Sequence, residues 1–342
     1  MPITPSHREG QSGATAAFMT DFLSAWGFRA VVLAFRLGVF RVLTEKPRSP
    51  EETAKLLGLD PKGTAFLLDV LDCLGYVSAH AGVYSPTEIT RHLVPMVSDG
   101  VPYFEKIVFR DWGGLEDRLR GATTLPFEPD EPRTPRWLAQ EWRVFQDGMI
   151  ALANMNIEEV VRETPVPASA GHVLDLGGGH GFYSIELCRR HQGLTSTVLE
   201  IPEMERIVRR TVAAHEMEGR VSFRAGDFFT DDLGTASVIL LFNVIHSKSE
   251  PQNRKLVERV ATAVEPGGVV VLLDQFAAPE FGPLGRAFGS MMSLSMYNNI
   301  GQQTYGLPQV REWFTQAGLE RVTTRPLDSA PGNALVIGHR PA

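Results

Sequence analysis

The sequence predicts an α/β fold in which a mostly parallel β-sheet is covered by helices on both faces and is preceded by a smaller helical domain. Three observations support this prediction. With 342 residues, the chain is longer than one ordinary core requires. In its second half, short β-rich runs alternate with helical segments, which is typical of a parallel sheet. In its first half, helix signals are followed by one small hairpin.

The N-terminal elements follow from capping and turn residues. The polar start of the chain predicts a disordered tail, and apolar residues then recur at helical spacing. Ser49 followed by Pro50 and two acids opens a helix that stops at Gly58, and Asp60 opens the next helix. Two short β-rich runs then flank a turn. Helix, turn, helix and hairpin predict a winged helix; the ranges are tail 1–15, helices 18–43, 49–58 and 64–74, strands 76–78 and 83–85, and domain 16–97.

A connector and a second domain fill the remainder. The connector, 98–164, has a Pro- and acid-rich loop at 125–135 and a long helical pattern at 137–161, and the Pro165-Val-Pro167 break starts the domain 165–342. The strand candidates are His172–Leu176, Ser196–Glu200, Val221–Ala225, Ser237–Val244, Val269–Asp274 and Asn333–Gly338.

Composition narrows the possible partners and compartments. The 33 Lys and Arg against 40 Asp and Glu give a net charge of −7, which disfavours a nucleic-acid partner. Two cysteines cannot build a disulfide framework or a zinc cluster, and we expect no metal. The N-terminus lacks the pattern of a signal peptide and no apolar run approaches about 18 residues, so we expect a cytoplasmic protein without a membrane partner.

A glycine-rich loop follows the first strand of the second domain. Asp175 ends that strand, and Gly177, Gly179 and Gly181 precede a helix at 182–190. Such a loop lets the backbone approach a ligand at a helix N-terminus. The spacing of these glycines differs from the dinucleotide pattern G-x-G-x-x-G. The carboxylate of Asp175 would repel a pyrophosphate but suits the cationic methionine part of S-adenosylmethionine.

Two later strand ends carry residues that suit an adenosine. Glu200 closes the second strand, where a carboxylate can accept hydrogen bonds from both ribose hydroxyls. After the third strand, Asp227 can accept from the adenine amino group, and an aromatic ring of Phe228-Phe229 can stack on the base. These positions occur in the order that one adenosine ligand requires.

These residues resemble a known family, the S-adenosylmethionine-dependent O-methyltransferases with an N-terminal winged-helix dimerisation domain, typified by plant caffeate-type and bacterial polyketide enzymes. The resemblance covers about residue 18 to the end. It rests on Asp-Leu-Gly-Gly-Gly-His-Gly (175–181), Glu200, Gly-Asp-Phe-Phe (226–229), Val-Ile-His (244–246), Glu-Pro-Gly-Gly (265–268), Trp313-Phe314 and Ala-Gly-Leu (317–319). It implies a seven-stranded Rossmann-like domain, a homodimer, and S-adenosylhomocysteine as product.

The resemblance also implies roles for individual residues. His246 would be the general base that deprotonates a hydroxyl of a small aromatic acceptor, with Asp274 as the carboxylate that orients it. Asn243 and Met149 would lie at the cofactor. The acceptor pocket would be lined by Phe145, Met291, Met292, Met296 and Tyr297.

The sequence departs from this family directly after the expected base. The family carries His-Asp-Trp followed by an acid, whereas this chain has His246-Ser-Lys-Ser-Glu250. A C- or N-methyltransferase, or a homologue that binds S-adenosylmethionine without methyl transfer, therefore stays open as an alternative. A winged-helix transcription regulator is a remote one, because the helix after Pro61 carries Asp69 and Asp72 beside Lys62, without the basic surface that phosphate contact requires.

Overall fold

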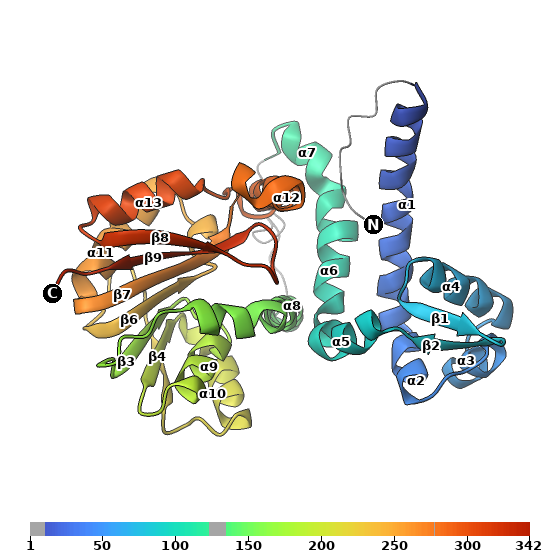
Figure 1. The fold of residues 1–342 in the computed structure, drawn as a ribbon, viewed down its shortest axis with the longest axis horizontal. Coiled ribbons are helices and arrows are strands. Elements are labelled where there is room, and N and C mark those ends of the chain that lie inside the picture. The colour runs from blue at the N-terminus through green and yellow to red at the C-terminus, as the bar shows by residue number, and fades with distance from the viewer. Residues whose placement is uncertain (1–10, 123–134, 277) are drawn as a thin grey trace. The chain divides into compact units, whose positions relative to one another are not determined.

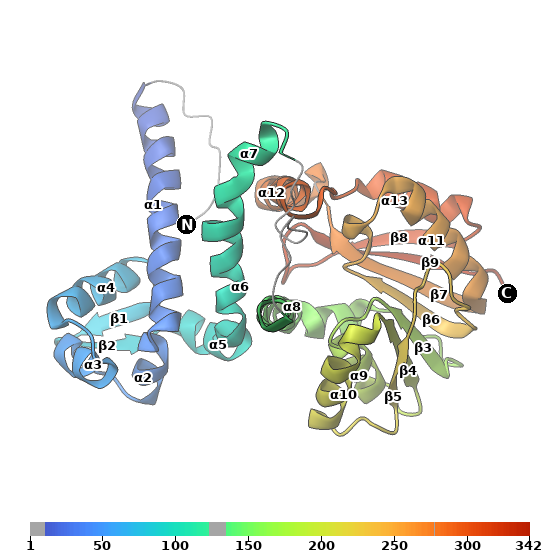
Figure 2. The same cartoon turned by 180° about the vertical axis from the view of Figure 1, so that it is seen from behind.

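The computed structural model describes residues 11–122, 135–276 and 278–342, which form two compact units (Figures 1 and 2). The first unit comprises Met1–Arg110 and Pro135–Leu152, and the second comprises Asp111–Thr134 and Ala153–Ala342. The expected tail 1–15 is helical from Gln11 onward, and residues 1–10 lie outside the described part. The predicted loop 125–135 also lies outside it, except for Pro135, the first residue of a helix.

The first unit contains the predicted helix–turn–helix and hairpin. Ser49 caps its helix with a complete capping box, and the Asp60 side chain accepts from the backbone N–H of Gly63. The single helix expected at 18–43 is broken by Gly38, whose φ of 78° is left-handed. The elements of the first unit are α1 (Gln11–Arg36), α2 (Val39–Glu45), α3 (Pro50–Leu57), α4 (Pro61–Cys73), β1 (Val77–His80), β2 (Val83–Pro86), α5 (Glu88–Val97), η1 (Ser98–Gly100), α6 (Val101–Lys106) and most of the π-helix η2 (Ile107–Asp111).

Helix α1 exposes an apolar surface. Its large exposed side chains include Phe18 and Trp26, which are 71% and 64% accessible. The segment Thr15–Arg36 has a mean hydropathy of 1.3, so by length and composition it could cross a membrane, in contrast to the expectation from sequence. Helices that pack against protein pass the same test.

The predicted connector does not form a separate unit, because helix α8 (Pro135–Glu163) contributes to both. In its first half, a Cβ on Gly148 would lie 2.2 Å from the ring of Tyr103, so helix backbone and ring are in direct contact. In its second half, Val160 is buried in the core of the second unit. The domain boundaries therefore differ from the predicted 16–97, 98–164 and 165–342.

The second unit is the predicted seven-stranded, mostly parallel sheet. The strand order is β5-β4-β3-β6-β7-β9-β8, and only β9 pairs antiparallel with both of its neighbours. The strands are β3 (His172–Leu176), β4 (Thr195–Glu200), β5 (Val221–Ala225), β6 (Ala236–Phe242), β7 (Val264–Gln275), β8 (Glu320–Pro326) and β9 (Asn333–His339). The sequence did not indicate β8.

Helices cover both faces of this sheet (Figure 1). Successive side chains of β6 alternate between two apolar cores: Ile239 packs with α11 and α13, and Leu240 packs with α8, α9 and α10. The helical elements are η3 (Trp112–Gly114), α7 (Leu115–Leu119), α9 (Phe182–Arg190), η4 (Pro202–Met204), α10 (Glu205–Ala214), η5 (Ile245–Ser247), α11 (Glu250–Ala263), η6 (Pro279–Phe281), α12 (Gly282–Ile300) and α13 (Leu307–Gln316).

Candidate active site

The strand order places the candidate residues at one edge of the sheet. The chain adds β4 and β5 outward from β3 on one side and then crosses to β6 and β7 on the other side of β3, so the order reverses between β3 and β6. Loops at the carboxyl ends of these two neighbouring strands enclose the crevice in which open α/β sheets bind ligands. The glycine loop follows β3, and η5 follows β6.

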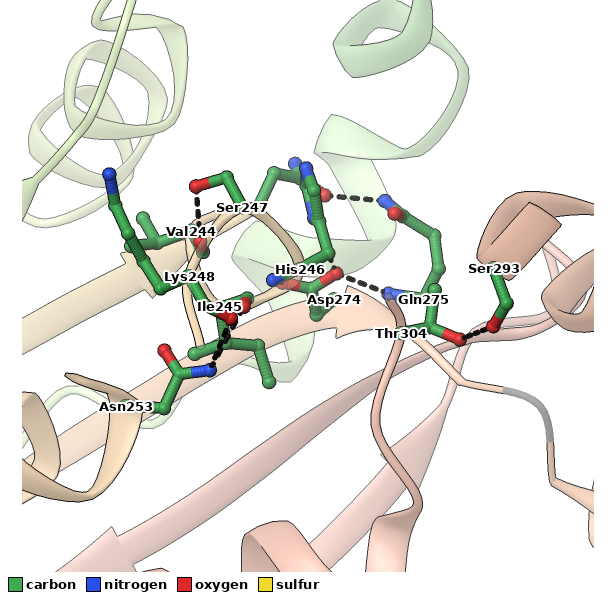
Figure 3. Close-up of polar contacts among 11 residues, drawn as sticks. Val244, Ile245, His246, Ser247, Lys248, Asn253, Asp274, Gln275, Ser293 and Thr304 are labelled. Carbon is green, nitrogen blue, oxygen red and sulfur yellow. Dashed lines mark hydrogen bonds and ion pairs between the residues drawn. The ribbon is translucent and has the colours of Figure 1, made fainter. Parts of the chain in front are cut away.

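His246 and Asp274 form a hydrogen-bonded pair at this edge (Figure 3). His246 lies in η5, and Asp274 is the penultimate residue of β7. The imidazole Nδ1 lies 2.8 Å from Asp274 Oδ1, and because a carboxylate only accepts, Nδ1 carries the proton. This tautomer leaves the lone pair of Nε2 available for a substrate proton.

The surroundings of His246 determine how strong a base it is. Burial lowers the pKa of the imidazole, but the negative charge of Asp274 and its hydrogen bond outweigh burial, so the pKa is raised above its ordinary value. Lys248 opposes this shift with a positive charge. Asp274 itself is fully buried, whereas His246 keeps 16% of its side chain accessible. A substrate can therefore reach the base but not its carboxylate partner.

Two buried polar residues hold the turn that carries His246. Asn253 on α11 donates from Nδ2 to the carbonyls of Ile245 (3.0 Å) and Lys248 (3.3 Å). The hydroxyl of Tyr305 donates to the same Lys248 carbonyl at 2.6 Å. Neither residue was predicted from the sequence. The only sequence signal for Asn253 is an amide among the apolar positions of an amphipathic helix.

A second polar pair lies beside the first. Gln275 Nε2 donates to Asn243 Oδ1 at 2.7 Å, and Asn243 has a left-handed φ of 57°, which only a few residue types tolerate. Within the described part of the chain, the buried Oε1 of Gln275 has no hydrogen-bond partner. Asn243 was expected at the cofactor, but Gln275 was not anticipated.

The glycine loop has the geometry of a close backbone approach. Gly177, Gly179 and Gly181 all have left-handed φ angles, of 68°, 55° and 80°. Gly178, which the sequence analysis did not single out, is required for a different reason: a Cβ there would lie 2.4 Å from Asp175 Oδ2. The loop thus leaves space where side chains would otherwise stand.

Asp175 is buried beneath this loop. Its Oδ2 accepts from the Ser184 hydroxyl at 2.7 Å, while its buried Oδ1 has no partner among the described residues. Burial raises the pKa of this carboxyl to about 6. An unpaired carboxylate oxygen and an open glycine cradle fit the ammonium-bearing methionine part of S-adenosylmethionine.

Glu200 and the loop after β5 supply the expected adenosine-binding groups. Glu200 ends β4, beside the end of β3, and burial raises the pKa of its carboxyl. The Phe228 ring approaches the glycine loop, because a Cβ on Gly177 would lie 3.7 Å from its edge. Asp227 Oδ1 accepts from the Phe229 N–H at 2.8 Å and shapes its own loop. Arg259 on α11 donates to the Phe228 carbonyl, which fixes this loop to that helix.

The expected acceptor-pocket residues are only partly brought together. Helix α12 lies against η5, and Met292 and Met296, four residues apart, share one face of it. Met291 points to solvent, and Tyr297 stacks under the guanidinium of Arg118, 4.9 Å from its ring centroid. The shared role of these four residues at the acceptor stays a prediction.

Two further expected residues belong to the other unit. Phe145 and Met149 lie on the first half of α8, where the Phe145 ring contacts Tyr103 and Trp142. Their roles at cofactor and acceptor stay predictions. Among residues 11–122, 135–276 and 278–342, no three His, Cys, Asp or Glu side chains are placed to hold a metal ion.

A family model of the O-methyltransferase domain matches residues 137–318, more than half of the chain. The chain belongs to this family. It is an S-adenosylmethionine-dependent methyltransferase with the predicted Rossmann-like fold, and the resemblance inferred from its motifs is confirmed.

The similarity of this methyltransferase to known proteins covers most of the chain. It is 27% identical to 3-hydroxy-5-methyl-1-naphthoate 3-O-methyltransferase of Streptomyces sahachiroi, over 94% of both chains. It is 24% identical to N,N-dimethyltransferase OxyT of Streptomyces rimosus, over 82% of this chain and 83% of that protein. The structure of human N-acetylserotonin methyltransferase in complex with SAM superimposes with a TM-score of 0.81 and 21% identity, covering 98% of this chain and 100% of that one.

Proposed function

We propose that this enzyme methylates a hydroxyl group of a small aromatic acceptor of the secondary-metabolite type, with His246 as general base. The observation that carries the proposal is the His246–Asp274 pair, which lies at the switch point of the sheet near the glycine loop. The naphthoate O-methyltransferase, similar over nearly the full length, supports the choice of an aromatic hydroxyl.

His246 and Asp274 have separate roles in the proposed methyl transfer. S-adenosylmethionine, when bound, supplies a methyl group already activated by its sulfonium. His246 Nε2 takes the proton of the acceptor hydroxyl, so that the oxygen can form its bond to the methyl carbon as the carbon–sulfur bond breaks. Asp274 fixes the ring tautomer and stabilises the imidazolium that results.

Cofactor and acceptor positions complete the proposal. Asp175 would face the methionine ammonium, the glycines would admit the cofactor backbone, and Glu200 would accept from the ribose. The proposed cofactor residues are Asp175, Gly177, Gly179, Gly181, Glu200, Asp227, Phe228, Asn243 and Met149, and the proposed acceptor residues are Phe145, Met291, Met292, Met296 and Tyr297.

The test begins with calorimetric titration of the purified protein with S-adenosylhomocysteine, S-adenosylmethionine and NAD. We expect both adenosyl ligands to bind and NAD not to bind. An acceptor panel of phenols, hydroxynaphthoates, arylamines and enolisable ketones then follows, read out as formation of S-adenosylhomocysteine. His246→Ala should abolish turnover and leave S-adenosylhomocysteine affinity nearly unchanged; loss of that affinity would instead make His246 a structural residue.

N-methylation is the second candidate, and the similarity to OxyT favours it. A neutral amine needs its proton removed only after attack, so His246→Ala should slow an arylamine far less than a phenol. C-methylation of an enolate would show the same dependence on His246 as a phenol, and product analysis separates these two. A protein that binds the cofactor and methylates no member of the panel would support the non-methylating alternative.

We also propose that the enzyme is a homodimer that uses the exposed face of α1. This face gathers Phe18, Phe22 and Trp26, and contiguous exposed apolar surface of this kind marks association sites. Light scattering should give twice the monomer mass of 37.7 kDa, and Trp26→Ser should shift it toward the monomer. If α1 were a membrane anchor instead, the protein would sediment with vesicles, and detergent would be needed to release it.

A cytoplasmic location, metal independence and the absence of nucleic-acid binding belong to the same proposal. The net charge of −7 supports the last of these, because phosphate backbones repel an acidic surface. A gel-shift assay at low salt, where electrostatic binding is strongest, tests the transcription-regulator alternative; binding of duplex DNA at micromolar protein would favour it.

A further inference from the structure

Lys248 lies in the segment where this chain departs from its family. Its backbone N–H donates to the Ile245 carbonyl at 3.1 Å, which closes the η5 turn. Its own carbonyl accepts from Tyr305 and from Asn253, two buried residues on different elements. The main chain of Lys248 is thus fixed from three sides, so its side chain projects from a rigid base.

The side chain of Lys248 extends over the aromatic pair. Its ammonium lies 5.9 Å from the ring centroid of Phe228 and 5.9 Å from that of Phe229. The two rings are themselves in contact, 4.9 Å between centroids at 51°. A cation within about 6 Å of an aromatic face is attracted to it. Figure 3 shows that the side chain of Lys248 leaves the η5 turn on the side opposite Gln275.

The positive charge of Lys248 also acts on Glu200. Burial and the charge of Glu203 on η4 raise the pKa of Glu200, whereas the backbone N–H of Ile201 and the charge of Lys248 lower it. Asp175 on β3 is a third acid in the group, since the charge of Glu200 raises the pKa of Asp175. Lys248 therefore opposes the rise in the pKa of Glu200 and favours the ionised form of this carboxyl.

We propose that Lys248 is a positioning residue of the adenosine-binding part of the site, where its ammonium holds Phe228 and Phe229 in place and its positive charge favours the ionised form of Glu200. The proposal rests on the proposed binding of the cofactor between these groups. It explains the departure from the family: the position has exchanged an aromatic side chain for a cation that organises two other rings and a carboxylate.

The test is a double-mutant cycle on S-adenosylhomocysteine binding, measured by calorimetry for wild type, Lys248→Met, Glu200→Gln and the double variant. Lys255, an exposed lysine in α11, provides the matched control Lys255→Met. We expect Lys248→Met to weaken binding about three- to tenfold, from loss of a nearby positive charge and of the cation–π contacts. In the Glu200→Gln background the same change should cost clearly less, whereas Lys255→Met should have no effect.

The pH dependence provides a second readout. Without Lys248 the Glu200 carboxyl protonates more readily, so the ratio of the dissociation constants of Lys248→Met and wild type should grow as the pH falls below neutrality. Lys248→Arg should restore wild-type behaviour. Wild-type affinity in Lys248→Met at every pH, or an equal loss in both backgrounds, overturns the inference. Failure of the wild type itself to bind S-adenosylhomocysteine would instead contradict the proposed function.

Discussion

Replacing Asp274 with asparagine separates the charge of this side chain from its hydrogen bonds. Asp274 Oδ1 accepts from His246 Nδ1 and from the Gln275 N–H, each at 2.8 Å. An amide keeps both bonds only if its oxygen occupies the Oδ1 position. Its NH₂ group then replaces Oδ2, which lies 3.4 Å from the backbone N–H of His246. The variant should therefore retain the ring tautomer and lose the negative charge.

The expected loss of kcat follows from the strength of the hydrogen bond between His246 and residue 274. A hydrogen bond to a charged group contributes ~1.5–3 kcal/mol, against ~0.5–1.5 kcal/mol between neutral groups. The difference of about 1–1.5 kcal/mol corresponds to roughly a tenfold lower kcat at the alkaline plateau. The loss of kcat should be at least this large, because the NH₂ group of the asparagine would also face the backbone N–H of His246.

The pH profile of kcat should also shift in Asp274→Asn, in a direction set by the pKa of His246. His246 acts as a base only when neutral, so activity rises as the pH passes through its pKa, which Asp274 helps to raise above the ordinary value. Removing the charge lowers that pKa, and the acidic limb of the kcat profile should move to lower pH. Initial rates of S-adenosylhomocysteine formation with an acceptor from the panel measure this. An acidic limb that stays in place or moves to higher pH would refute the reasoning, and so would a parallel loss of cofactor affinity.

Three further predictions concern the glycine loop, the pH dependence of cofactor binding and metal independence. Gly178→Ala places a methyl group 2.4 Å from Asp175 Oδ2, so we expect ~1–3 kcal/mol lower stability in thermal unfolding and weaker S-adenosylhomocysteine binding; Gly171→Ala, with open space around it, is the control and should change neither. Because the pKa of Asp175 is raised to about 6, calorimetric affinity for S-adenosylhomocysteine should fall as the pH decreases through about 6, and Asp175→Asn should bind weakly without this dependence. Dialysis against EDTA should leave kcat unchanged, and a loss that Mg²⁺ restores would show that the enzyme needs a metal.

The central strands were predictable because their side chains are buried on both faces of the sheet. β6 is buried along its whole length and is apolar except for Ser237, and β3 begins and ends at the predicted residues. β8 was missed because it is an edge strand with largely exposed Glu, Arg and Thr side chains, which look like a loop. The break between α1 and α2 was missed because the left-handed conformation of Gly38 interrupts an otherwise regular helical pattern.

The candidate site was predictable where a motif carries it. The glycine loop and Glu200 were placed by strand ends and the His246–Asp274 pair by the resemblance, and the structure brings them to one edge of the sheet. Residues that act from behind the site were not predictable. Asn253 and Tyr305 reach the η5 turn from α11 and from the segment after α12, and such contacts depend on packing between distant parts of the chain. Tyr297 was assigned to the pocket by the resemblance; its contact with Arg118 could not be predicted from the sequence, and its role at the acceptor stays a prediction.

The pairing of β7 has a consequence for how the chemistry is encoded. β7 is held in one register by β6, with Leu273 opposite Phe242, and by β9, with Asp274 opposite Ala334 and Gln275 opposite Asn333. Neighbouring residues of a strand point to opposite faces, so a slip of one residue would present the neutral amide of Gln275 to the imidazole and turn the carboxylate away. Strand β9, which contributes no residue to the proposed reaction, therefore decides which of two adjacent side chains becomes the partner of the base.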